Sequence, residues 1–378
     1  MKSRHLASTI ALLLSGAIAI AQEPAPAAPQ RKIDVLINGA AKDTIYLANY
    51  YGNKLYYSDT AIADAKGHVT FNSKRGYKAG VYAVVVPGPK FFELIMNEPV
   101  IEMATDKEDL LPKLEVKNSK ENDIFLNYIR FLNERKEEGD ALRAQQDKAA
   151  DPIGKGALKA KMEDLDKQVK EYQRNLIETN AGTLAASLVK MSMSLELPEP
   201  KKADGTLDSA AAYYQYRAHF WDNFDLSDDR IVRVPVFHNK LEEYIGKVVV
   251  QAPDTINKWA DELIGRTKDG SEVFQYVTQF ITNKYQSSEI MGMDAVFAHM
   301  ALTYYCPGPN KPSRAFWMND ENLEKLCERA RKMDPLTIGK KAKNIILTDT
   351  TGEKWISMYD LPQEYVMIIF WDPHCGHC

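Results

Sequence analysis

The sequence has few cysteines, no histidines at ligand-like spacing and no long basic run, and each shortage excludes a class of protein. Four cysteines among 378 residues are too few for a disulfide-scaffolded fold. His219, His238 and His299 have no metal-ligand spacing and are interpreted as structural or surface residues. The formal net charge is −4, without a basic block that would attract nucleic acid. We therefore expect no cofactor, no metal and no nucleic-acid partner.

The N-terminus lacks an apolar run of membrane-spanning length. Lys2 and Arg4 precede an apolar run centred on residues 10–14, well short of the roughly 20 residues that cross a bilayer. This pattern predicts a cleavable secretory signal over residues 1–21, followed by a Pro/Ala linker over 22–32. Removing the two positive charges would take the formal charge from −4 to −6. We expect a protein of the periplasm or cell envelope.

Residues 33–117 are rich in short β-type runs. The runs are separated by turn signals such as Asp64–Gly67 and Pro87–Pro89. They predict an antiparallel β-sandwich or barrel of about seven strands.

Helical periodicity dominates residues 118–335. Asn118 with Glu121 predicts a capping box at the start of the first helix. A heptad seam follows on an otherwise charged helix, at Leu158, Met162, Leu165, Val169, Tyr172 and Leu176. An intramolecular helical hairpin is favoured over a dimeric coiled coil because the seam is under three heptads long.

Two features of the helical region have alternative interpretations. The aromatic-rich stretch 213–230 is either the lining of a groove for a peptide or sugar or, as favoured here, a core helix followed by an acidic loop. Cys306 follows an apolar helical stripe and Cys327 lies on an apolar helix face, and the two form either a structural disulfide or two buried thiols. Neither cysteine is interpreted as catalytic.

The motif at 375–378 carries the chemistry that the sequence suggests most strongly. The apolar run Val366–Phe370 predicts a central strand buried on both faces. A cysteine directly after such a strand lies at the start of the next helix, where backbone N–H groups stabilise its thiolate. Cys375 is the predicted nucleophile and Cys378 the resolving thiol, while His377 stabilises the thiolate further.

Metal and haem interpretations of the same motif are disfavoured. Four ligands within the five residues 374–378 give poor tetrahedral geometry. Attachment of c-type haem needs a histidine directly after Cys378, which the sequence does not include.

Residues 338–378 resemble the thioredoxin-like superfamily, in particular the TlpA/ResA-like thiol-disulfide oxidoreductases of the bacterial envelope. The matching positions are Asp349 to Gly352, Asp360-Leu361, Phe370-Trp371 and Cys375 to Cys378, with Lys343 standing where the family often has proline. In the family, the turn that matches Asp349 to Gly352 joins two short strands, so the resemblance implies a hairpin there. The resemblance implies disulfide exchange with protein or peptide substrates, an envelope redox partner, and modulation of the cysteine pair by Trp371 and His377.

The resemblance also implies a fold that extends beyond these residues. In the family, a helix, further strands and a cis-proline loop follow the motif. We expect residues 336–378 to be the N-terminal part of a truncated thioredoxin-like α/β domain with little activity by itself. The predicted whole is a multidomain α+β protein. The order of a β-rich region and a helical region ahead of a redox domain resembles a group of envelope thioredoxin-like proteins. The alternative is a non-enzymatic binding or assembly module formed by the β-rich and helical regions.

Overall fold

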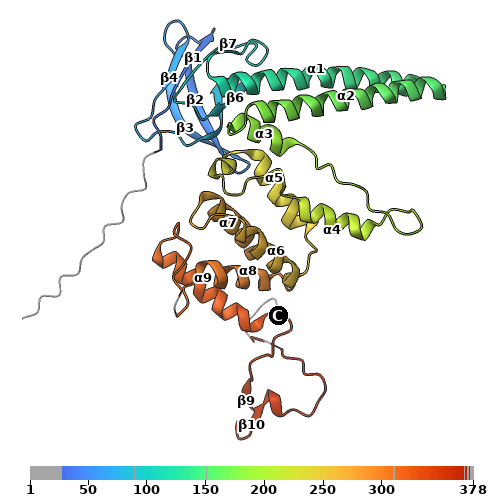
Figure 1. Cartoon of the computed structure of the whole chain (residues 1–378). Helices are drawn as coiled ribbons and strands as arrows, with labels where there is room; N and C mark the ends of the chain where they lie inside the picture. The colour runs from blue at the N-terminus through green and yellow to red at the C-terminus, as the bar shows by residue number, and fades with distance from the viewer. Residues whose placement is uncertain are drawn as a thin grey trace, which may run out of the picture.

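The computed structural model describes residues 28–88, 90–149, 151–309, 311–369, 371–372 and 374. The chain begins with a β-rich region, continues into a mainly helical region and then forms a small β-hairpin (Figure 1). This is a multidomain α+β protein, as predicted. The expected signal segment and the linker residues 22–27 lie outside the described residues.

The β-rich region contains two four-stranded sheets, ordered β4-β1-β7-β8 and β3-β2-β5-β6. The strands are β1 (Lys32–Asn38), β2 (Thr44–Tyr51), β3 (Lys54–Ile62), β4 (His68–Phe71), β5 (Gly80–Val86), β6 (Lys90–Met96), β7 (Val100–Asp106) and β8 (Glu115–Asn118). The prediction of about seven strands missed β8, whose sequence EVKN has no apolar alternation.

One strand pair corrects the prediction of an antiparallel sandwich. β1 and β7 run parallel, with Lys32 opposite Val100 and Asn38 opposite Asp106. Every other strand pair of the two sheets is antiparallel in the described residues. A parallel neighbour needs a long connection, and here the connection from β1 to β7 passes through the second sheet.

Alternating side chains hold the two sheets together. In β1, Ile33, Val35 and Ile37 are fully buried, while the residues between them are more exposed. Ile101 and Met103 of β7 join the same apolar cluster. This period of two buries one face of β1 and of β7.

The helical region is built from nine longer helices and several short ones in the described residues. The helices are α1 (Lys120–Lys148), α2 (Pro152–Thr179), α3 (Leu184–Ser192), α4 (Ser209–His219), α5 (Pro235–Glu243), α6 (Pro253–Gly265), α7 (Glu272–Gln286), α8 (Asp294–Met300) and α9 (Asp320–Met333). The short turns are 3-10 helices η1 (Asp229–Arg233), η4 (Asp334–Leu336) and η5 (Met358–Asp360), and π-helices η2 (Tyr244–Val248) and η3 (Ala301–Tyr305).

The predicted capping box at Asn118 was displaced by one residue. Asn118 is the last residue of β8, and Ser119 caps α1 by accepting a hydrogen bond from the Asn122 backbone N–H at 3.1 Å. Glu121 instead accepts from the backbone N–H groups of Leu184 and Ala185 at 2.8 and 3.2 Å. Its carboxylate therefore caps α3, a contact between residues more than sixty positions apart.

The predicted helical hairpin is confirmed. α1 and α2 lie side by side and project from the rest of the molecule (Figure 1). Phe131 stacks on Tyr172 with ring centroids 4.0 Å apart, and Leu165 and Leu176 of the predicted seam are buried. The seam of α2 therefore packs against the preceding helix of the same chain.

The Asn122 side chain joins the β-rich region to α1. It accepts a hydrogen bond from the Ile95 backbone N–H at 2.7 Å and donates to the Ile95 carbonyl at 2.8 Å. β6 is an edge strand, so Asn122 satisfies backbone groups that no neighbouring strand reaches.

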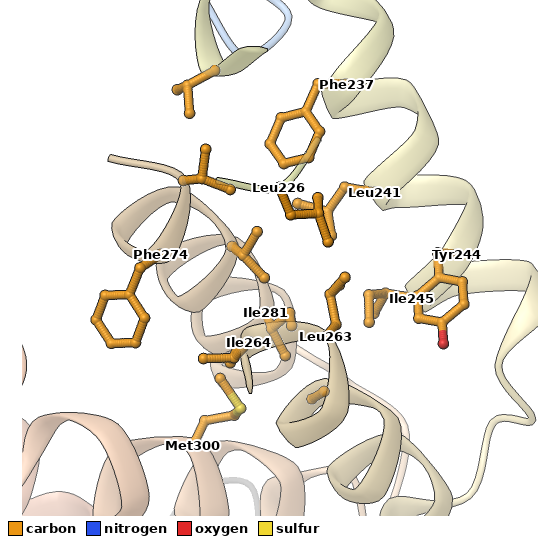
Figure 2. Close-up of a cluster of buried hydrophobic side chains, with 14 of the residues drawn as sticks. Leu226, Phe237, Leu241, Tyr244, Ile245, Leu263, Ile264, Phe274, Ile281 and Met300 are labelled. Carbon is orange, nitrogen blue, oxygen red and sulfur yellow. The ribbon is translucent and has the colours of Figure 1, made fainter. Parts of the chain in front are cut away.

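The core of the helical region collects aliphatic and aromatic side chains from helices α5 to α8 (Figure 2). Phe237, Leu241, Ile245 and Ile281 are all fully buried there.

None of the helices in the described residues has the length and apolar character needed to cross a bilayer.

Candidate functional site

The predicted central strand at Val366–Phe370 does not form in residues 366–369. These residues belong to no strand, and Met367 and Ile369 are 84% and 75% exposed. A strand buried on both faces needs a sheet on each side and cover above and below it, and no other described segment supplies either. The prediction was wrong for these four residues, and Phe370 lies outside the described residues.

The segment before this run does form the expected hairpin. β9 (Ile346–Thr348) pairs antiparallel with β10 (Trp355–Ser357). Asp349 closes the turn between them: its carboxylate accepts from the Thr351 hydroxyl at 2.6 Å, and the hydrogen bond from this hydroxyl helps to lower the pKa of Asp349. Gly352 has a φ of 78°, a conformation that glycine adopts readily.

The hairpin leaves its apolar side chains uncovered. Leu347 is 65% exposed and Trp355 is 69% exposed. Trp371, predicted to modulate the cysteine pair, is 70% exposed. The backbone N–H of His374 donates to the Asp372 carboxylate at 2.8 Å. Cys375, His377 and Cys378 lie outside the described residues.

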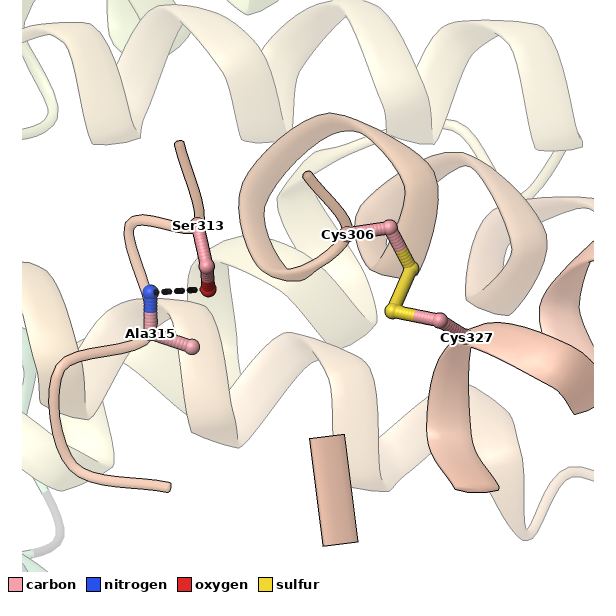
Figure 3. Close-up of a disulfide and its surroundings, with 4 residues drawn as sticks. All are labelled: Cys306, Ser313, Ala315 and Cys327. Atoms are coloured by element: carbon pink, nitrogen blue, oxygen red, sulfur yellow. Dashed lines mark hydrogen bonds between the residues drawn. A yellow bond between two sulfur atoms is a disulfide. The ribbon is translucent and has the colours of Figure 1, made fainter. Parts of the chain in front are cut away.

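Cys306 and Cys327 form a disulfide between the end of η3 and helix α9 (Figure 3). Their Cα atoms are 5.5 Å apart, and the residues are 5% and 2% exposed. Because both sulfurs are buried, the bond is suited to crosslinking the helical region and is shielded from an exchanging thiol. The sequence left open a disulfide or two buried thiols, and the structure contains the disulfide.

A cavity of about 780 Å³ lies where the β-rich region meets the helical region. Strands β2, β3 and β5 supply Asn49, Tyr51, Tyr56, Ser58 and Tyr82, the segment before β5 supplies Ser73, Arg75, Gly76, Tyr77 and Lys78, and η1 supplies Arg233. Tyrosines and cations therefore dominate the lining, a combination of aromatic faces, hydroxyl donors and positive charge suited to an anionic ligand.

A second cavity of about 480 Å³ shares Tyr51 and Tyr56 with the first. Its lining includes Lys54 of β3, and His238, Tyr276 and Lys284 of the helical region. Among the described residues, no aspartate or glutamate lines either cavity. Both cavities lie along the start of β3, and we name the surface that they share the β3 groove.

Close backbone contact builds the β3 groove. The Gly52 N–H donates to the Val232 carbonyl at 2.7 Å, and a Cβ at Gly52 would lie 1.7 Å from the Tyr276 hydroxyl oxygen. Only glycine allows the β2–β3 turn to approach α7 so closely, because its φ is also positive, at 63°. The β3 groove therefore lies beside a direct contact between the β2–β3 turn and helix α7.

An ion-pair network fixes the charge at one wall of the groove. Arg233, whose side chain is 7% exposed, and Lys78 both pair with the Glu272 carboxylate. Burial alone would raise the pKa of Glu272, but the two cations outweigh burial and lower it. Burial also raises the pKa of Tyr82 to about 12, so its hydroxyl stays protonated at neutral pH.

We expect Glu272→Gln to reduce the free energy of unfolding at pH 7 by about 1.5 kcal/mol, because it removes a charge-assisted hydrogen bond. A carboxylate with a lowered folded pKa stabilises the protein above its unfolded pKa of about 4.3, and this contribution is lost as the pH falls through the folded value. The difference between wild type and variant, measured by chemical denaturation, should therefore shrink from pH 7 to pH 3. The exposed Glu289→Gln is the matched control, and a difference that stays constant with pH would contradict the prediction.

A second polar cluster lies in the helical region. His299 Nε2 is 2.9 Å from both carboxylate oxygens of Asp261, and the Tyr304 hydroxyl donates to Asp261 at 2.7 Å. Burial alone would raise the pKa of Asp261, but these hydrogen bonds outweigh it and lower that pKa. These contacts join Asp261 of α6 to His299 of α8 and to Tyr304 of η3.

The aromatic-rich stretch 213–230 divides between two environments. α4 has no buried residue, whereas Phe220, Trp221, Phe224 and Leu226 just after it are in the core.

Sequence reasoning missed the β3 groove because its residues come from separated stretches. The only local signal was the tyrosine content of the runs at 44–51 and 54–62.

Two parts of the chain match known protein families. Residues 32–125 match a family described as a domain of unknown function (DUF4369), and residues 157–333 match one described as a domain of unknown function (DUF5106). The first match covers the sandwich and the start of α1, and the second runs from α2 to the end of α9. No curated protein matches the chain.

Proposed function

We propose that the protein is a thiol-disulfide oxidoreductase of the cell envelope, in which Cys375 and Cys378 exchange disulfides with protein or peptide substrates. The proposal rests on the resemblance of residues 338–378 to the TlpA/ResA-like, thioredoxin-like enzymes. The observation that supports it best is the uncovered apolar surface of the β9–β10 hairpin and residues 366–369. A two-stranded hairpin with three residues in each strand is stable only within a larger sheet. The uncovered apolar surface is therefore suited to packing within a larger sheet.

The proposed reaction uses the two thiols in sequence. The Cys375 thiolate attacks one sulfur of the substrate disulfide, forms a mixed disulfide and releases the other substrate sulfur as a thiolate. The Cys378 thiolate then attacks Cys375, releases the second substrate thiolate and leaves a Cys375–Cys378 disulfide. The substrate gains two electrons, and an envelope dithiol partner restores the reduced pair.

The buried Cys306–Cys327 disulfide supports the envelope location. Structural disulfides persist in oxidising compartments and are rare where thiols are kept reduced. The bond is also distinct from the exchanging pair because both of its sulfurs are buried.

The test uses the protein expressed from its native reading frame. The Cys378→Ser variant should accumulate a mixed disulfide with a model disulfide substrate, detected by intact mass, because the resolving thiol is missing. The Cys375→Ser/Cys378→Ser variant should lose insulin reduction by at least about 100-fold. Cys306→Ala/Cys327→Ala is the matched control and should retain the activity. Retained insulin reduction in Cys375→Ser/Cys378→Ser would reject the assignment.

The β3 groove favours a second function, that of a binding module formed by the β-rich and helical regions. This function needs no redox chemistry, because the groove lies in the β-rich region and at its junction with the helices. Binding that survives Cys375→Ser/Cys378→Ser would support it, and the experiment in the next subsection measures this binding.

A further inference from the structure

We propose that the β3 groove binds an acidic polypeptide segment in extended conformation, which lies along the first half of β3. The inference deepens the proposed binding function and is independent of the proposed redox chemistry. It rests on three observations: an open strand edge, two neighbouring cavities lined by residues of that strand, and the charge of these cavities.

The open edge is the first half of β3. β3 is the outermost strand of its sheet and pairs only with β2 in the described residues. The Tyr77 side chain lies beside the second half of β3, where its hydroxyl donates to Asp59 at 2.5 Å. Residues 54–58 are exposed in the described part of the chain, with Tyr56 and Tyr57 49% and 70% exposed. An exposed strand edge offers backbone donors and acceptors to a further extended chain.

The groove follows the same residues. Ser58 and Tyr56 line the larger cavity, and Tyr56 and Lys54 line the smaller one. Lys54 to Tyr57 pair regularly with β2, and a β-bulge follows at Ser58. At about 3.3 Å per residue, these four positions match an extended segment of about four residues. Every second side chain of an added strand points to the same face, so alternate side chains of the segment would enter the groove.

The charge of the groove selects acidic side chains. Arg75 and Lys78 line the larger cavity, and Lys54 and Lys284 line the smaller one. Glu272 neutralises part of the charge of Arg233 and Lys78, whereas no ion pair to Arg75, Lys54 or Lys284 occurs in the described part of the chain. Tyrosine hydroxyls and cations together favour carboxylates at the positions that enter the groove.

A designed probe tests the proposal on the full chain carrying Cys375→Ser/Cys378→Ser, so that redox exchange does not contribute. The probe is a fluorescent, acetylated (Glu-Thr)4 amide, and (Lys-Thr)4 is its charge-reversed control. Binding followed by fluorescence anisotropy should occur for (Glu-Thr)4 and weaken with added salt, while (Lys-Thr)4 should not bind. Absence of (Glu-Thr)4 binding up to about 1 mM would overturn the proposal.

Variants locate the binding on the protein. Lys54→Gln and Arg75→Gln should each weaken (Glu-Thr)4 binding about two- to fivefold, since each removes one exposed cation. Lys66→Gln is the matched control, because Lys66 is an exposed lysine in the turn beyond the other end of β3. Equal weakening by Lys66→Gln would show that general surface charge, and not the groove, attracts the peptide.

Modified probes separate strand addition from other modes of binding. N-methylation of the glutamates or of the threonines removes the N–H groups that face one side of the added strand. One of these two isomers should lose about tenfold in affinity, because it loses its hydrogen bonds to β3. Equal affinity of both isomers and the parent would overturn the extended, strand-like mode. Binding of tetragalacturonate in place of the peptide would reassign the groove to an anionic sugar.

Discussion

Replacing Phe237 with alanine is expected to lower the free energy of unfolding of the helical region by about 3–5 kcal/mol. Phe237 is fully buried, and its ring centroid lies 6.2 Å from that of Trp221 and 6.0 Å from that of Tyr276. Truncation removes a large apolar side chain and leaves a cavity among rigid neighbours that cannot collapse into it. Chemical denaturation followed by tryptophan fluorescence measures the effect, because all five tryptophans lie at or beyond position 221.

The control for this variant is the same change at an exposed phenylalanine. Phe316 is 54% exposed, so Phe316→Ala should cost less than about 1 kcal/mol. Equal effects of the two variants would show that the cluster in Figure 2 is not the stabilising core of the helical region.

Removing the Cys306–Cys327 disulfide is expected to cost about 3 kcal/mol. The bond joins residues 21 positions apart, and its loss frees that loop in the unfolded chain and increases its conformational entropy. The Cys306→Ala/Cys327→Ala variant should show this loss in chemical denaturation under oxidising conditions, and dithiothreitol should lower the stability of the wild type by a similar amount.

Two comparisons keep this result separate from the cysteines at 375 and 378. The Cys375→Ser/Cys378→Ser variant should retain its full sensitivity to dithiothreitol, while Cys306→Ala/Cys327→Ala should have none. If dithiothreitol still destabilised Cys306→Ala/Cys327→Ala, the stabilising bond would lie elsewhere in the chain.

Local sequence patterns predicted the features whose causes are local. The short β-type runs after Ile33 predicted strands, and the seam from Leu158 to Leu176 predicted a helix packed on its neighbour. Asp349 and Gly352 predicted the hairpin turn, because one carboxylate and one residue with positive φ are enough to close it. These features require little more than the chain on either side of them.

Features that join distant segments could not be predicted in this way. The parallel pairing of β1 with β7 depends on where the second sheet packs. The prediction of a cap at Asn118 was wrong because Asn118 pairs with Glu102 as part of β8. The run 366–369 is exposed because a strand buried on both faces needs partners that the sequence of the run does not specify.

The sequence by itself determined the order of β-rich and helical regions, the buried faces of their elements and the turn of the last hairpin, because periodicity and turn chemistry act within a few residues. Only the tertiary structure decided that Asn122 completes the edge of β6, that Gly52 brings a β-turn against Tyr276, and that tyrosines and cations meet in the β3 groove. Each of these contacts joins side chains from separate elements, and their meeting depends on how whole sheets and helices pack.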